Sequence, residues 1–416
     1  MTNDTKKALV SRQYIIPFVL VTSLFFMWGF ARAVLDVLNK HFQDVMDISI
    51  TRSAMVQATT YIGYFLMALP AGLFITRFGY RRGVVLGLLL FGIGSLLFIP
   101  AADVMSFNFF LIALFIIACG LVVLETAANP YVTELGDPST SASRINLAQS
   151  FNGLGCILAP FLVGQLLFND SSSESAVALP YTVMGVVVLI VAVVFTRVKL
   201  PEINLPEQEA EAASHSLAPE PSTTGAVIRR LLSSRKFTLG LLALFCYEIS
   251  EISINSLFIN YATYDGWLTA AQASRILSFG CLLLFMLARV FGSWVMSRVA
   301  AERVLAVCAL MTVLGSLAVT LDLGAVSRAG VFVCYAFEAI MFPTIFAITI
   351  GGLGGKSTKI AAAFLMMSPL GGAVGTVLMG WVGDATASMS TAFAVPCVGY
   401  CFVLLYSWMV ATRRIG

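Results

Sequence analysis

Long apolar segments recur along the whole chain, and they decide in which solvent it folds. A helix needs about 20 predominantly apolar residues to cross the ~30 Å hydrocarbon core of a bilayer. Segments of that length lie near residues 14–38, 52–76, 83–104, 107–133, 145–168, 178–198, 238–262, 271–297, 302–323, 328–350, 358–382 and 390–412. We therefore predict an all-α membrane protein with twelve transmembrane helices.

The composition excludes most other classes of protein. Of the 416 residues, 59% are hydrophobic and 11% charged, whereas a soluble domain carries about 25% charged residues. The net charge of +3 is too small to indicate a nucleic-acid partner. The eight cysteines lie in apolar stretches without metal-ligand spacing, so we expect no metal site. The first apolar segment is too long for a signal peptide and is expected to stay as a span.

The chain divides into two parts of six spans each. We predict an N-terminal half over 1–198, a linker over 199–237 and a C-terminal half over 238–416. The linker begins with a Pro-, Glu- and Ser-rich stretch and ends in a short basic amphipathic helix, AVIRRLLSSRKF. The halves echo each other at an offset of about 213 to 221 residues, as in ETAANP and EAIMFP. Such duplication predicts pseudo-symmetric halves with a substrate site between them.

Positive charges predict the orientation. With the N-terminus inside, nearly all Lys and Arg outside the spans fall on the inner side, and the exceptions are Lys40, Arg52, Arg275 and Arg328. Because positive residues stay on the cytoplasmic side, both termini and the linker are expected to be cytoplasmic.

Charged residues within spans indicate function, since each costs several kcal/mol in hydrocarbon unless it meets a partner or water. These residues are Arg32, Asp36, Glu125, Glu248, Glu251, Arg289 and Glu338. Arg32 and Asp36, four apart, share a helix face. They either pair permanently, or Arg32 turns elsewhere and Asp36 titrates to couple transport to protons. Glu125, among small residues, is predicted to bind hydroxyls or carry a proton. We expect Glu338 to pair with Arg289.

Amides and aromatic residues suggest a polyhydroxylated ligand. RINLAQSFNGLG places Asn146, Gln149 and either Asn152 or Gly153 along one helical side, where amides bind hydroxyls or join helices. Aromatic rings that either stack on a sugar or merely pack are Trp28, Tyr61, Tyr64, Phe151 and Tyr247. Arginines predicted to make gating contacts at the inner ends of spans are Arg77, Arg81, Arg82, Arg298 and Arg303.

Several motifs resemble known families. GxxxTRFGYRR resembles the loop motif of the major facilitator superfamily, with Thr76 where an acid is usual. LFFMWGFARAVLDVL, ETAANPYVTELG and RINLAQSFNGLG resemble the fucose:proton symporter family of sugar permeases. The resemblance implies the major facilitator fold and uptake of a monosaccharide with a proton. Its essential acids fall on Asp36 and Glu125, and its cavity amides on Gln149 and Asn152, with Gln57 and Asn129 nearby.

The chain also departs from that family. Arg32 and Ala33 stand where fucose permeases are rich in Asn, Glu251 stands in place of an amide, and Met341 replaces another. These departures weigh against L-fucose itself. We count Arg32, Tyr247 and Glu251 with the amides as substrate-binding residues.

The sequence thus predicts a secondary active transporter that carries a hexose or deoxyhexose with H⁺, and no enzyme activity. The alternatives are a carrier of a sugar acid that contacts Arg32, a drug or sugar efflux antiporter, and a non-transporting membrane sensor. We expect a monomer in the bacterial inner membrane, with sugar and lipid as its partners, no nucleic acid and no cofactor besides the coupling ion.

Overall fold

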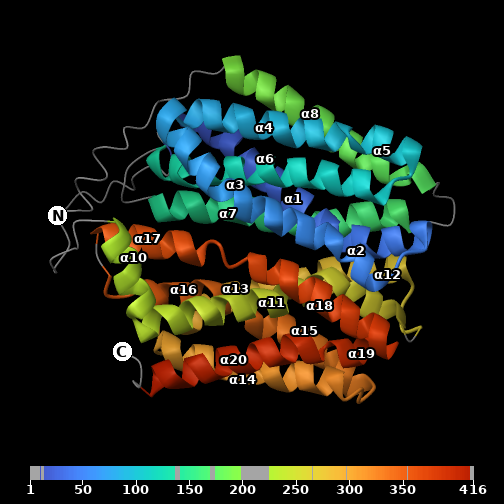
Figure 1. Ribbon diagram of the computed structural model, residues 1–416, viewed down its shortest axis with the longest axis vertical. Coiled ribbons are helices and arrows are strands. Elements are labelled where there is room, and N and C mark those ends of the chain that lie inside the picture. The colour runs from blue at the N-terminus through green and yellow to red at the C-terminus, as the bar shows by residue number, and fades with distance from the viewer. Residues whose placement is uncertain are drawn as a thin grey trace, which may run out of the picture. The chain divides into compact units, whose positions relative to one another are not determined.

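The computed structural model describes residues 10, 14–135, 141–168, 174–197, 224–264, 266–296, 298–353 and 355–412. All regular elements in these ranges are helices (Figure 1). Within these ranges, twelve helical segments are long and apolar enough to cross a bilayer. The predicted twelve-span, all-α membrane protein is therefore confirmed.

The first six spans contain several helices that break within the span. They are α1 (Ile15–Met46), α2 (Ile50–Ser53) with α3 (Met55–Phe78), α4 (Tyr80–Leu96) with α5 (Phe98–Val104), α6 (Phe107–Glu134), α7 (Ser141–Leu167), and α8 (Ala178–Arg197) preceded by the 3₁₀ turn η3 (Glu174–Val177). Gly79 joins α3 to α4 with a φ of 85°, a conformation that favours glycine.

The second six spans follow the amphipathic helix α10 (Thr224–Ser233). They are α11 (Arg235–Tyr264), α12 (Ala270–Ile276) with the π-helix η4 (Leu277–Leu282) and α13 (Leu283–Met296), α14 (Ala301–Thr320), α15 (Ala325–Glu338) with α16 (Met341–Ile350), α17 (Gly355–Leu365) with α18 (Leu370–Thr386), and α19 (Met389–Ala392) with α20 (Ala394–Ala411).

The helices form two compact units, and each unit is built from two separate stretches of the chain. One unit comprises Met1–Leu35 and Ile62–Asn204, and the other comprises Asp36–Tyr61 and Leu205–Gly416. In the first unit α4 lies beside α6 and α8 (Figure 1). In the second, α11 packs against α18 and α20, and α2 packs against α18. The C-terminal part of α1, from Asp36 onward, thus groups with helices that follow the linker, while the predicted domain limits stay a prediction.

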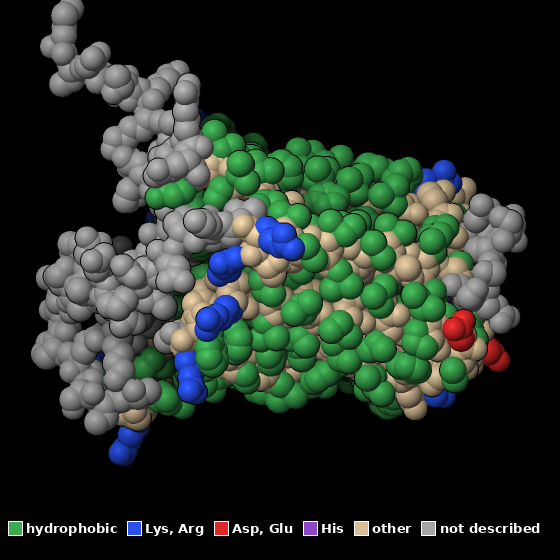
Figure 2. Space-filling model, turned by 90° about the horizontal axis from the view of Figure 1, so that it is seen from above, with side chains coloured by type: hydrophobic (Ala, Val, Ile, Leu, Met, Phe, Trp, Pro, Cys, Tyr) green, Lys and Arg blue, Asp and Glu red, His purple; other side chains and the backbone are tan. Residues whose placement is uncertain are grey.

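Large apolar side chains lie on the surface. Leu69, Val290 and Val398 are 73%, 68% and 70% exposed, and hydrophobic side chains cover most of the described face in Figure 2. Such a surface is unfavourable in water but matches lipid tails, which are as apolar as these side chains.

Helices α1 and α7 cross closely at two glycines. A Cβ at Gly29 would overlap the Asn152 carbonyl, and one at Gly155 would overlap the Phe26 carbonyl. Asn152 Nδ2 donates to the Phe25 carbonyl oxygen at 3.0 Å across the same crossing. Small residues let helix backbones approach in a membrane, where the hydrophobic effect does not drive helices together.

We expect Gly155→Ala to destabilise the protein by about 1–3 kcal/mol, since the added Cβ would overlap the Phe26 carbonyl and force α1 and α7 apart. Gly72→Ala is the matched control, because a Cβ at Gly72 meets nothing within 4 Å. Thermal unfolding in detergent measures both variants. Equal melting temperatures for the two would contradict the close crossing.

Candidate substrate and proton site

Asp36 is buried within the second unit and is bound by polar side chains. Its side chain is 9% exposed. Gln57 Nε2 donates to Asp36 Oδ1 at 2.9 Å, and Ser256 Oγ donates to the same oxygen at 3.3 Å. Asn39 Nδ2 donates to the Ser256 carbonyl oxygen at 3.0 Å. These contacts join α1, α3 and α11 around the predicted proton-coupling carboxylate.

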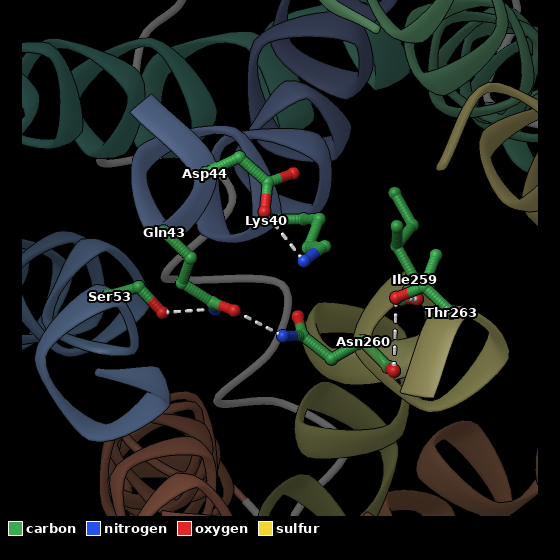
Figure 3. Close-up of polar contacts among 7 residues, drawn as sticks. All are labelled: Lys40, Gln43, Asp44, Ser53, Ile259, Asn260 and Thr263. Atoms are coloured by element: carbon green, nitrogen blue, oxygen red, sulfur yellow. Dashed lines mark hydrogen bonds and ion pairs between the residues drawn. The ribbon is translucent and has the colours of Figure 1, made fainter. Parts of the chain in front are cut away.

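A second set of contacts lies one helical turn further along α1 (Figure 3). Gln43 Nε2 donates to Ser53 Oγ at 2.6 Å, and Asn260 Nδ2 donates to Gln43 Oε1 at 2.5 Å. The pairs Asn39–Ser256 and Gln43–Asn260 are both 217 residues apart. This separation lies within the offset of the sequence repeat, so equivalent positions of the first and seventh spans bind each other.

These contacts were missed at the level of sequence, although a signal was present. Asn39 and Gln43 are four apart on α1, as are Ser256 and Asn260 on α11, so each pair presents one polar face in an apolar helix. The same unit holds another long-range contact, in which Asp384 accepts from the backbone N–H groups of Ile50 and Thr51 at 3.1 and 2.8 Å.

Glu125 and Arg32 lie in the first unit and attract each other electrostatically. Asp36, in the second unit, accepts hydrogen bonds from Gln57 and Ser256. The attraction between Glu125 and Arg32 places a negative group near Arg32, while the permanent pairing of Arg32 with Asp36 and its alternative both stay predictions.

The predicted amides differ in their surroundings. Asn152 donates to the Phe25 carbonyl oxygen, so its amide joins two helices, whereas Gln149 is exposed. Gln57 Oε1 and Asn129 Oδ1 are buried and have no hydrogen-bond partner among the described residues. Buried acceptors of this kind normally bind water or a ligand, which makes these two oxygens candidates for hydroxyl contacts.

The predicted aromatic residues also divide into packed and accessible rings. Tyr61 is 4% exposed in a cluster with Ala58 and Ile252, and Tyr247 is 2% exposed with its ring 6.3 Å from Phe342. Phe151 is 42% exposed. Trp28 is partly exposed, and its Nε1 donates to Tyr64 Oη at 2.9 Å. Stacking on a sugar stays a prediction for all five aromatic residues, and Phe151 has the ring with the largest stated exposure.

Arg289 has a different contact from the expected one with Glu338. Span ten breaks between α15 and α16, where Pro343 has no N–H to offer the carbonyl four residues before it. Arg289 Nε donates to that carbonyl, of Ala339, at 2.9 Å. Glu338 is fully buried and accepts a hydrogen bond from Tyr400 Oη. Arg289 attracts Glu338 electrostatically but forms no ion pair with it among the contacts of the described chain.

Glu251 accepts a hydrogen bond from Asn255 Nδ2 at 2.8 Å, one turn along α11.

The predicted gating arginines have local contacts. Arg81 donates to the carbonyl oxygens of Phe195 and Thr196, and the Arg77 and Arg298 guanidinium groups lie 5.3 and 3.9 Å from the rings of Phe78 and Trp294. Arg82 and Arg303 are exposed near the starts of α4 and α14. Gating stays a prediction for all five.

The twelve spans, the matching polar faces of the first and seventh spans, and the buried carboxylates together define a membrane carrier built from two six-helix repeats. The family model of the Major Facilitator Superfamily matches residues 18–375, and the chain belongs to this family. An L-fucose-proton symporter of Escherichia coli strain K12 is 35% identical over 96% of this chain and 94% of its own length. A glucose/galactose transporter of Brucella abortus is 32% identical over 93% and 92%.

A solved structure agrees with these relatives. The crystal structure of FucP, a Major Facilitator Superfamily transporter in the outward conformation, is 33% identical in sequence. It matches with a TM-score of 0.67 and covers 96% of this chain and 99% of FucP. These relatives are transporters, which confirms the expectation that the protein is not an enzyme.

Proposed function

We propose that this protein is a secondary active transporter that carries a neutral monosaccharide, a hexose or deoxyhexose, together with a proton. The observation that carries the proposal is the buried Asp36 carboxylate within a span, bound by Gln57 and Ser256. A carboxyl that is alternately buried and wet can gain and lose a proton during alternating access. The names of the relatives, proton symporter and sugar transporter, support the same function.

The substrate would bind through hydroxyl groups. The unpartnered oxygens of Gln57 and Asn129 can accept hydrogen bonds from sugar hydroxyls. Glu125, Gln149 and Glu251 are further proposed contacts. Because the Glu125 carboxylate attracts Arg32 electrostatically, the charge of Arg32 is at least partly matched without a substrate anion. This favours a neutral sugar over the alternative, a sugar acid bound by Arg32.

The remaining parts of the proposal follow from this function. We propose that the protein is a monomer in the bacterial inner membrane. We also propose that both termini are cytoplasmic, because most Lys and Arg residues outside the spans lie on the same side as the termini. The coupling ion is H⁺, and no cofactor takes part in transport.

Transport into proteoliposomes tests the proposal. We expect labelled hexose or deoxyhexose to accumulate when the outside is more acidic, to stop accumulating when a protonophore is added, and to ignore a sodium gradient. A thermal-shift panel of hexoses, deoxyhexoses, polyols and hexuronates then identifies the substrate class. Stabilisation by hexuronates alone, lost in Arg32→Ala, would instead establish the sugar-acid carrier, and accumulation driven by sodium would refute proton coupling.

A further inference from the structure

A surface pocket lies where α3 meets α4, within the first unit. Its volume is about 550 Å³. Three arginines line it, and apolar side chains form the rest of its wall, among them Phe78, Leu86 and Leu89. The pocket therefore combines dense positive charge with an apolar surface at the end of two spans.

Within the described ranges, carbonyl oxygens and an aromatic ring, rather than acids, are the partners of the arginines in this pocket. Arg81 is held by the carbonyl oxygens of Phe195 and Thr196 at the end of α8. The Arg77 guanidinium lies against the Phe78 ring, and Arg82 is exposed. Neither Arg77 nor Arg82 forms an ion pair with a carboxylate in the described part of the chain. Two guanidinium groups are therefore available for a ligand.

The start of α4 adds to the positive potential. Gly79 precedes this 17-residue helix and provides no side-chain cap, so the first N–H groups of α4 remain available as donors. The positive end of a helix dipole favours anions and disfavours cations. Yet Arg81 and Arg82 occupy the first turn. The two arginines therefore repel the positive end of the helix dipole, and an anion bound among these positive charges would balance them.

The apolar wall identifies the kind of anion. Phe78 and Leu89 are 40% and 41% exposed beside the arginines. A free phosphate would leave this surface in contact with water, whereas a phospholipid covers it with its acyl chains. We propose that the pocket binds an anionic phospholipid, with its phosphate against Arg77, Arg82 and the start of α4, and its acyl chains along Phe78 and Leu89.

Native mass spectrometry of the purified full-length protein in detergent tests this site. Dioleoylphosphatidylglycerol should bind the wild type more tightly than dioleoylphosphatidylcholine does. In Arg77→Gln/Arg82→Gln the affinity for phosphatidylglycerol should fall about thirtyfold, because each basic contact near a membrane surface contributes about fivefold. Arg81 is not substituted in this variant, because its side chain also donates a hydrogen bond to the end of α8. Arg298→Gln/Arg303→Gln, with the same change of charge in the second half, should bind as the wild type does.

Three outcomes would overturn the proposal. They are unchanged affinity in Arg77→Gln/Arg82→Gln, equal binding of phosphatidylcholine, and displacement of phosphatidylglycerol by millimolar inorganic phosphate, which would indicate a simple anion site. Arg77→Lys/Arg82→Lys keeps the charge and should retain most of the affinity. If the double glutamine variant melts far below the wild type, Arg82→Gln alone decides the question, since this exposed side chain forms no hydrogen bond or ion pair with the described residues.

Discussion

Replacing Asp36 with asparagine should abolish accumulation of sugar against its gradient, while sugar still exchanges across the membrane. Asparagine has nearly the same shape, and its oxygen can accept the hydrogen bonds of Gln57 and Ser256. The amide cannot gain and lose a proton. A gradient of one pH unit supplies about 1.4 kcal/mol per proton, or about tenfold accumulation. The variant should instead reach a ratio of about one, with counterflow exchange preserved.

Asp44→Asn provides the matched control on the same helix. Asp44 Oδ1 lies 2.7 Å from Lys40 Nζ in an exposed ion pair (Figure 3), and such pairs contribute about 0–1 kcal/mol. Proteoliposomes with this variant should accumulate sugar as the wild type does. Normal accumulation by Asp36→Asn would show that Asp36 is not the coupling carboxyl.

Glu125→Gln should also abolish concentrative uptake, and unlike Asp36→Asn it should weaken the fold. Removing the carboxylate deprives Arg32 of a negative neighbour within the first unit. A poorly compensated charge in a span costs up to about 3 kcal/mol. We expect uptake to fall at least tenfold and the melting temperature in detergent to drop. Tracer uptake and thermal unfolding of the same preparation measure both effects.

A double substitution separates the two roles of Glu125. Arg32→Gln in the Glu125→Gln protein removes the poorly compensated cation, so thermal stability should recover while uptake stays lost. This coupling is the interaction energy of a double-mutant cycle. Recovery of uptake in the double variant would mean that Glu125 only neutralises Arg32. No recovery of stability would mean that the two charges act independently.

The spans could be predicted because hydrocarbon accepts only long apolar helices with satisfied backbones. The ends of the spans and their internal breaks were harder to predict from the sequence. The first span was expected over 14–38, yet α1 continues to Met46, since a helix extends past the lipid on polar residues that hydropathy does not count. Pro343 indicates the break between α15 and α16, but no local pattern reveals that the Arg289 guanidinium of another helix binds the carbonyl left free there.

The candidate site was accessible from sequence only in part. Asp36 and Glu125 stood out because charge within a span is costly. Their partners did not, because a helical sequence shows which residues share a face but not which helix that face meets. Ser256 follows Asp36 by 220 residues, and Tyr400 follows Glu338 by 62.

By itself, the sequence determined the membrane as solvent, the number of spans, the duplication and the few charged residues that can carry protons. Each follows from the composition of single helices and the free energy of placing them in hydrocarbon. Only the tertiary structure decided how those residues are used: Asp36 with Gln57 and Ser256, Asn152 as a link to α1, and Arg289 on a backbone carbonyl. The physical reason is that these contacts form between helices, and the crossing of helices depends on side-chain shape over the whole bundle.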